Sequence, residues 1–289
     1  MNRQSLDKSV LKNVIDIHVH TGPDGYRSRM YDDLSLAQKG MEFGMRGAML
    51  KSHQFCTADR AIVANQLFEQ RFRLFGGLAL NRWTGGLNPY AVEAALALHA
   101  DVIWLPTLHS ALDRRGIGKP DGIEVVDGSH VVPELDTILR LMAQTNTAAL
   151  ATGHYTAREL LIVVDRAREL GVERIIINHP ALFRMQMTIA EQRELAHYQV
   201  YFERCYGGSN APIGHTYLVN VDDNIRAIRE LGCASTIVAS DLGADNTEEW
   251  TNGLANYIHM LYDAGFTTAE IDEMTKINPA KALNLDVVI

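Results

Sequence analysis

The segment VIDIHVHTGPD, residues 14–24, decides the fold expected for this chain. His18 and His20 are two positions apart at the end of a strand-like run, so both side chains project to the same side of that strand. Seven similar apolar runs follow along the chain, at residues 46–51, 72–80, 101–106, 148–152, 174–178, 200–203 and 235–240. They are too uniformly apolar for half-exposed antiparallel strands, so we expect strands that are buried on both faces.

Amphipathic, helix-like segments separate these runs, at residues 33–43, 57–70, 89–99, 133–144, 156–170, 221–231 and 248–264. Strands that alternate with helices predict a parallel sheet, either a closed (β/α)8 barrel or an open doubly wound sheet. No Gly-x-Gly-x-x-Gly motif follows the first run, which weakens the open sheet that binds dinucleotides. We find no linker or low-complexity segment. The prediction is therefore an α/β chain folded as one (β/α)8 (TIM) barrel domain over residues 1–289.

The longest irregular stretch, residues 107–132, follows the fourth predicted strand. A long loop at that place is expected to form a lid over an active site. The alternative interpretation is a surface loop without a role in the site.

Composition excludes several classes of protein. Hydrophobic residues make up 47% and charged residues 21%, which is typical of soluble globular proteins. A formal net charge of -8 without a basic stripe argues against a nucleic-acid partner. The sequence has no apolar run long enough for a membrane span, and residues 1–14 lack the apolar region of a signal peptide, so we expect neither. Cys56, Cys205 and Cys233 are far apart and odd in number, which fits the reducing cytoplasm. We expect a small-molecule substrate as the partner, and the chain is compatible with a homo-oligomer.

Polar side chains gather at the ends of the predicted strands. They are His18 and His20 after the first strand, Lys51 and His53 after the second, His109 after the fourth, His154 after the fifth, His179 after the sixth, Glu203 after the seventh and Asp241 after the eighth. In a (β/α)8 barrel the active site lies at the carboxyl ends of the strands. Converging imidazoles and a carboxylate suit a divalent metal. The joint pattern therefore predicts a metal site at the barrel mouth.

This ordered set resembles the amidohydrolase superfamily. That family is a (β/α)8 barrel with a His-x-His motif after strand one, histidines after strands five and six, and an aspartate after strand eight. The matching segments here are DIHVHTGPD (16–24), ATGHYT (151–156), INHP (177–180), ASDLG (239–243) and the closing INPAKALNL (277–285). The resemblance thus spans nearly the whole chain, and it does not specify a substrate.

The resemblance implies a metal-dependent hydrolase that cleaves an amide, cyclic amide or lactone. His18, His20 and Asp241 would hold one ion. His154 and His179 would hold a second, or His154 would join the first site and His179 would stabilise charge. Zn²⁺ is expected ahead of Mn²⁺, with one or two ions. Asp241 would take a proton from the attacking water as general base.

Lys51 marks a departure from the family pattern. Many members carry a carboxylated lysine after strand four that bridges two metals, but strand four here ends Leu-Pro-Thr-Leu-His. Lys51 follows an apolar run, so its stem is expected to be buried and its charge to need a partner. Either Lys51 is carboxylated and bridges two ions, or it stays a cation and binds an anionic substrate beside a single ion.

Three arginines, Arg82, Arg184 and Arg204, are expected near the mouth, where with Lys51 they would bind a carboxylate-bearing substrate. The alternative for each is a solvated surface charge. A second function stays open: a non-oxidative decarboxylase or hydratase of the same superfamily that uses one metal. A catalytically dead barrel ranks last because the whole ligand set is present.

Overall fold

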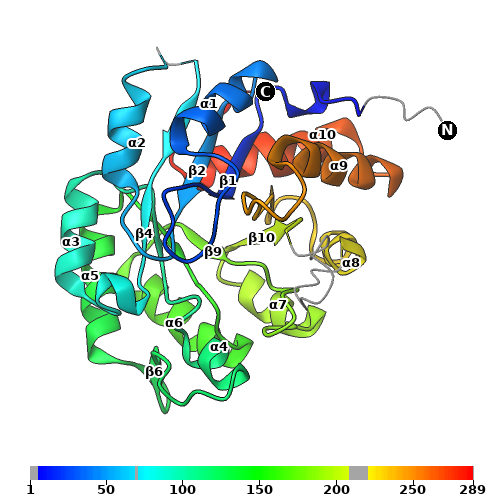
Figure 1. Ribbon diagram of the computed structural model, residues 1–289. Coiled ribbons are helices and arrows are strands. Elements are labelled where there is room, and N and C mark those ends of the chain that lie inside the picture. Colours follow the sequence, from blue (N-terminus) through cyan, green and yellow to red (C-terminus); the bar gives the residue numbers. More distant parts are fainter. Residues whose placement is uncertain (1–5, 69–70, 208–220, 289) are drawn as a thin grey trace.

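The computed structural model describes residues 6–68, 71–207 and 221–288 (Figure 1). Its barrel strands are β1 (Ile15–His20), β2 (Gly47–Lys51), β3 (Arg73–Phe75), β4 (Gly77–Ala79), β5 (Val102–Trp104), β8 (Ala149–Ala151), β9 (Ile175–Ile177), β10 (Tyr201–Cys205) and β11 (Thr236–Ala239). Each overlaps one of the eight predicted runs, and β3 and β4 share one run that Gly76 interrupts. A Cβ on Gly76 would lie 2.5 Å from the carbonyl oxygen of Thr57, so glycine permits close approach of the start of the preceding helix there.

Backbone hydrogen bonds close these strands into a ring. Parallel pairing runs from β1 through β2 to β3, and from β4 through β5, β8, β9 and β10 to β11. The ring closes between β11 and β1. The amide of Asp241 donates to the carbonyl of His18 over 2.8 Å, and the amide of His20 donates to the carbonyl of Leu242 over 2.9 Å. The predicted (β/α)8 barrel is therefore confirmed.

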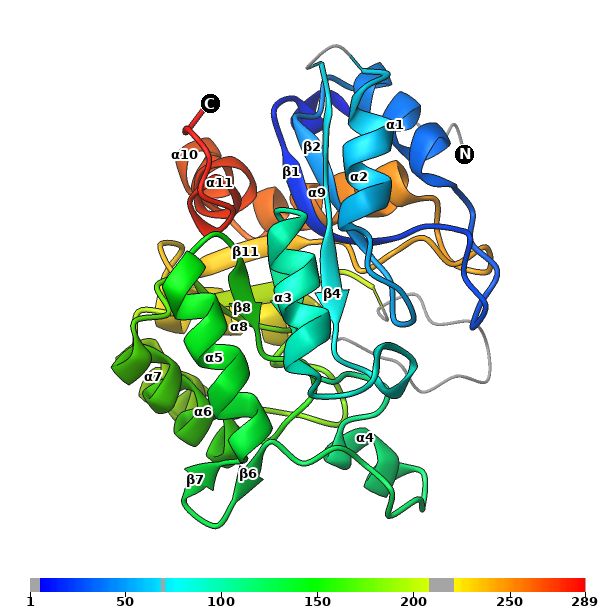
Figure 2. The same cartoon turned by 90° about the vertical axis from the view of Figure 1, so that its left-hand side faces the viewer.

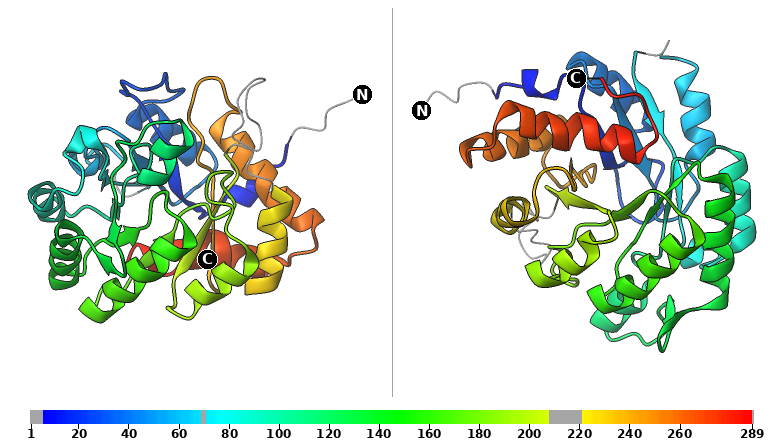
Figure 3. Two further views of the ribbon diagram at one scale, coloured as in Figure 1. Left: turned by 90° about the horizontal axis from the view of Figure 1, so that it is seen from below. Right: turned by 180° about the vertical axis from the view of Figure 1, so that it is seen from behind.

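Helices surround the strands (Figure 3, left). They are α1 (Asp33–Glu42), α2 (Ala58–Asn65), α3 (Pro89–Ala97), α5 (Pro133–Thr145), α6 (Ala157–Leu170), α7 (Ile189–Ala196), α8 (Val221–Leu231) and α9 (Trp250–Asp263). α2 ends at Asn65, earlier than the helix predicted over residues 57–70, and residues 69–70 lie outside the described part of the chain. Capping boxes at Thr156 and Thr188 fix the starts of α6 and α7.

The C-terminal segment closes the end of the barrel opposite the strand-end histidines. It consists of α10 (Thr268–Asp272), a π-helical turn (Glu273–Ile277) and α11 (Asn278–Ala282). Ala280, Ala282 and Leu283 pack against inward side chains of the strands, including Ile17 and Trp104. This apolar cluster fills the barrel interior and leaves the carboxyl ends of the strands for polar groups.

The stretch over residues 107–132 is partly regular, which the sequence did not predict. It contains the helix α4 (Ala111–Gly116) and an antiparallel hairpin of β6 (Val126–Asp127) and β7 (His130–Val131). Ser110 caps α4 by accepting from the amide of Asp113 over 3.0 Å. The hairpin and α4 project together at the lower edge of the molecule (Figures 1 and 2). We call residues 107–132 the β5–α5 insertion.

None of the described helices is long and apolar enough to cross a membrane.

Asp16 joins the two strands at which the barrel closes. It is fully buried in β1, where its Oδ1 accepts from the amides of His18 (3.1 Å) and Ser240 (3.0 Å). Its Oδ2 accepts from the indole N–H of Trp250 in α9 over 2.8 Å. The side chain therefore holds backbone and indole N–H groups, and it ties β1 to the end of β11 and to α9.

We predict that Asp16→Ala lowers the free energy of unfolding by about 3 kcal/mol or more, because three buried N–H donors lose their acceptor. Urea denaturation followed by circular dichroism measures the change. Asp7→Ala is the matched control, since the exposed carboxylate of Asp7 accepts from the amide of Ser9 and holds no buried donor. A loss below about 1 kcal/mol in Asp16→Ala would contradict this role.

Candidate metal centre

Asp241 is the point at which the two histidines of β1 meet. Its Oδ1 lies 3.0 Å from Nε2 of His18 and 3.1 Å from Nε2 of His20. His179, which follows β9, belongs to the same group: ligand atoms of His18, His179 and Asp241 all lie within 4.8 Å of one another. The three histidines are buried, whereas the Asp241 side chain keeps 26% of its exposure. Four of the residues predicted from sequence thus converge.

Glu203 fixes the orientation of His18. Its Oε2 lies 3.1 Å from Nδ1 of His18 and accepts from the side-chain amide of Asn178 over 2.8 Å. Burial alone would raise the pKa of Glu203, but His18 lowers it to about 2. An ionised carboxylate only accepts, so Nδ1 of His18 carries a proton and Nε2 is the nitrogen directed at Asp241. The sequence placed Glu203 at a strand end but did not indicate this role.

Lys51 lies inside the site, as its position after an apolar run predicted. It ends β2 with 2% exposure, and its Nζ is 2.9 Å from Nε2 of His18. Burial lowers the pKa of Lys51, while the charges of Asp241 and Glu203 oppose that shift. Lowering the pKa increases the share of neutral amine, which is the form that reacts with CO2.

The donor set fits a divalent cation. Burial lowers the pKa of His18, but Asp241 and Glu203 outweigh it and raise that pKa to about 9. Without an ion, a proton must therefore join His18 to Asp241, and a divalent cation can take the place of that proton. Burial and the charge of Arg29 lower the pKa of His20 to about 3, which favours the neutral imidazole that ligates metals. Buried Nδ1 atoms of His20 and His179 have no hydrogen-bond partner among the described residues.

A second group, His18, Glu203 and Cys205, also brings three ligand atoms within 4.8 Å of one another. Its members suit a metal less well. Nδ1 of His18 already bonds Glu203, and burial raises the pKa of the Cys205 thiol well above its ordinary value. A protonated thiol is a poor metal ligand. We therefore place the ion at the Nε2 side of His18.

His154 is held by a residue from the β5–α5 insertion. Its Nδ1 lies 2.5 Å from Oδ2 of Asp113 in α4, and Oδ1 of Asp113 lies 2.8 Å from Nε of Arg184. The ring of His154 is 4.8 Å from that of His179, centroid to centroid. Asp113 therefore orients His154 in the way that a carboxylate on the other ring nitrogen commonly orients a metal-ligating histidine. The sequence analysis missed Asp113. Its signal was Ser-x-x-Asp over residues 110–113, which marks a helix start but not a contact with His154.

The three predicted arginines lie in different places. Arg184 reaches the site through Asp113. Arg82 pairs with Asp121 at 2.6 Å and is 42% exposed, outside the histidine group. Arg204 is a correction: it is fully buried on the other face of β10, where its guanidinium donates to the side chain of Gln192. Successive residues of a strand point to opposite faces, so an inward Glu203 places Arg204 outside the barrel mouth.

A family model matches residues 13–203 of the chain; its description is "Family of unknown function (DUF6282)". The chain belongs to the DUF6282 family. This match covers the first seven strands of the barrel, from β1 to most of β10, and so includes all the proposed ligands except Asp241. Comparison with curated proteins gives no match.

Solved structures share the fold of this DUF6282 member. An amidohydrolase from Pseudomonas aeruginosa is 10% identical with a TM-score of 0.66, over 96% of this chain and 97% of the other. A putative 2-pyrone-4,6-dicarboxylic acid hydrolase from Pseudomonas putida is 13% identical with a TM-score of 0.60, over 96% and 99%. A 2,6-dihydroxybenzoate decarboxylase is 11% identical with a TM-score of 0.56, over 95% and 100%. The resemblance to the amidohydrolase superfamily is thus confirmed for the fold.

Proposed function

We propose that this DUF6282 member is a metal-dependent hydrolase of a small amide, cyclic amide or lactone that carries a carboxylate. The observation that carries the proposal is Asp241, whose Oδ1 meets Nε2 of both His18 and His20 while its side chain stays partly exposed. One carboxylate can then touch the ion on one side and an attacking water on the other. The fold shared with hydrolases supports the proposal.

His18, His20 and Asp241 would hold the first ion, with Zn²⁺ ahead of Mn²⁺. His179 lies within reach of the same centre, and His154 stands next to it with Asp113 on its Nδ1. These two would hold a second ion, or His154 would join the first and His179 would stabilise charge. When bound, the metal supplies a Lewis acid that polarises a carbonyl and makes water more acidic.

The protein's own groups perform the proton transfers. Asp241 accepts the proton of the attacking water and returns it to the leaving amine or alkoxide. Glu203 keeps a proton on Nδ1 of His18, so Nε2, which is directed at Asp241, is the nitrogen that an ion would use. Arg184, which pairs with Asp113, would bind the substrate carboxylate. Cytoplasmic location belongs to the same proposal.

A non-oxidative decarboxylase is the second candidate, and Lys51 is the observation that favours it. As an unmodified cation 2.9 Å from Nε2 of His18, Lys51 could bind the carboxylate that leaves as CO2. A carboxylated Lys51 that bridges two ions favours the hydrolase. The state of this one side chain therefore separates the two functions.

We predict that the protein purified without added metal holds at least one divalent transition metal per chain, and that His18→Ala with His20→Ala removes it. Both imidazoles meet the oxygen of Asp241, so their loss leaves one carboxylate as the anchor. Metal analysis by mass spectrometry measures the content. His99→Ala with His197→Ala is the control, because these histidines end helices outside the site. Unchanged metal in the first double variant would contradict the ligand assignment.

We predict that Asp241→Asn lowers turnover by about 10²–10⁴-fold while the protein stays folded, because asparagine keeps the shape but accepts no proton from water. A screen of amide and lactone substrates identifies the activity, and steady-state kinetics then measure the change. Asp245→Asn, on the same loop, is the control. Near-wild-type turnover in Asp241→Asn would contradict the role of Asp241 as general base.

Lys51→Ala distinguishes one ion from two. If Lys51 is carboxylated, the wild type holds about two ions per chain, the variant loses one or both, and bicarbonate helps the metal-free protein to recover them. If Lys51 stays a cation, the variant keeps its metal and mainly raises KM. We expect the first result. A single ion in the wild type, kept in Lys51→Ala, would favour the decarboxylase.

A further inference from the structure

A line of five rings leads from the metal centre to the surface. The ring centroids of His20 and His53 are 4.8 Å apart, and those of His53 and Tyr26 are 6.3 Å apart. Tyr26 is 5.9 Å from Trp83, and Trp83 is 4.4 Å from His109. Apart from His20, which ends β1, the rings come from the segments that follow β1, β2, β4 and β5. The hydrolytic mechanism uses none of these rings beyond His20. We call them the ring line.

One buried asparagine joins three of the segments that carry the ring line. Asn81 is fully buried, and its Oδ1 accepts from the amides of Thr107 and His109 at 3.1 Å each. Its Nδ2 donates to the carbonyl of His53 over 3.1 Å and to Oγ1 of Thr107 over 2.9 Å. Nδ1 of His53 is itself 3.0 Å from that hydroxyl. Three loops are thereby tied together before any ligand arrives, which lowers the cost of ordering them on binding.

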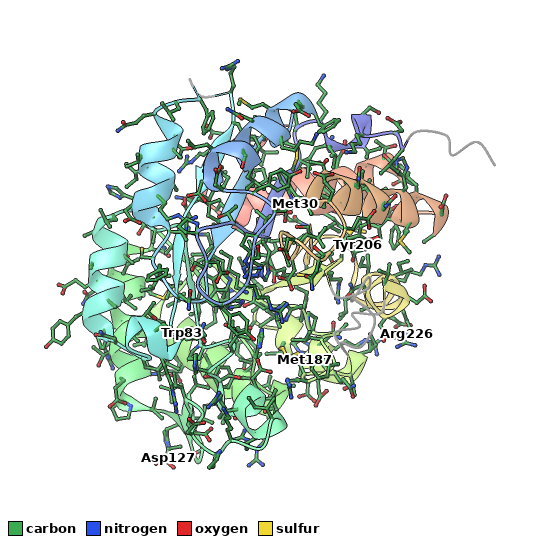
Figure 4. All side chains as sticks on the ribbon, in the orientation of Figure 1. Met30, Trp83, Asp127, Met187, Tyr206 and Arg226 are labelled. Atoms are coloured by element: carbon green, nitrogen blue, oxygen red, sulfur yellow. The ribbon has the colours of Figure 1, made fainter. Side chains whose placement is uncertain are left out.

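The outer part of the ring line is open to solvent. Tyr26 is 43% exposed and Trp83 is 46% exposed, whereas Trp104 and Trp250 are buried. In Figure 4, Trp83 and Tyr206 lie apart, to the left and the right of the barrel centre. Trp83 follows β4, so it stands at the carboxyl end of that strand, beside the mouth. Exposed rings in a pre-organised row beside a catalytic centre offer flat surfaces for another ring.

Charge along the ring line is positive in an acidic protein. Arg29 is paired with Asp24, and it lies close enough to lower the pKa of His20 and of His53. Near His109, both Arg82 and Arg114 pair with the one carboxylate of Asp121. The guanidinium groups of Arg29, Arg82 and Arg114 thus share two carboxylates, in a chain whose formal net charge is -8. A further guanidinium, that of Arg27, lies over the ring of Tyr26, 5.4 Å from its centroid. A local excess of positive charge favours an anionic ligand.

We propose that the ring line binds the flat ring of the substrate, so that the substrate class is an aromatic or heteroaromatic carboxylate. Tyr26 and Trp83 stack on or edge against that ring, and the guanidinium groups attract its anionic charge. The proposal rests on the proposed function in one respect: the reacting group is the one that reaches Asp241. It goes further because it specifies the ring and the residues that select it.

Benzoate and cyclohexanecarboxylate test the proposal, since they share ring size and charge and differ in aromaticity. Calorimetry with the metal-loaded full chain measures both affinities. We expect benzoate to bind about 2- to 12-fold more tightly, the range that aromatic pairs contribute. Trp83→Ala should abolish that preference and Trp83→Phe should retain most of it. Tyr90→Ala, 80% exposed on α3, is the control that leaves it unchanged.

Equal affinities for the two acids, no benzoate binding, or an undiminished preference in Trp83→Ala would overturn the proposal. Metal content is measured on the same samples, which separates this inference from the function. A metal-loaded protein without a preference for benzoate contradicts the role of the ring line and leaves the proposed hydrolase function standing. A preference for benzoate in a chain that holds no metal supports the role of the ring line and contradicts the proposed function. Because Trp83 is the exposed tryptophan of the three, iodide quenching of its fluorescence with and without benzoate gives a second readout that must agree.

Discussion

The carboxylate of Asp16 is the constraint on which both the barrel and its site depend. It binds the amide of His18 in β1, the amide of Ser240 after β11 and the indole of Trp250 in α9. Ser240 directly precedes Asp241. The group that joins the last strand to the first therefore also sets the spacing between the histidines and the aspartate of the proposed metal site. The same buried side chain therefore closes the barrel and positions the proposed ligands.

Around that point, two of the proposed histidine ligands are each oriented by a carboxylate. Glu203 holds His18, and Asp113 holds His154. Burial favours neutral imidazoles and a neutral Lys51, while the carboxylates favour positive charge on the same groups. These opposing tendencies leave a negative centre surrounded by nitrogen donors, which is the environment that a divalent cation stabilises. The site is thus organised by partners as much as by ligands.

The sequence predicted those features that recur with the strand–helix period. Eight apolar runs indicated the barrel, and strand-end residues such as His18, His179 and Asp241 indicated where ligands converge. Local patterns failed where contacts are non-local. Nothing near Asp113 indicates that α4 returns to His154, since that contact depends on how the insertion folds back over β8. The error for Arg204 has a different cause. Arg204 directly follows Glu203 in β10, so strand alternation already predicts that their side chains point to opposite faces of the strand.

The β5–α5 insertion gives the protein a part that can vary apart from its scaffold. Gly116 ends α4 against Arg184, and a Cβ there would lie 1.9 Å from Nη1 of Arg184. A shift of α4 would therefore move Asp113, and with it the guanidinium of Arg184 and the imidazole of His154. Sequence drift within a segment of this kind changes the setting of His154 while the barrel core and its closure stay as they are. Within the DUF6282 family, we therefore expect sequence differences in this segment to move His154, whereas the strands keep the positions of His18, His20 and Asp241.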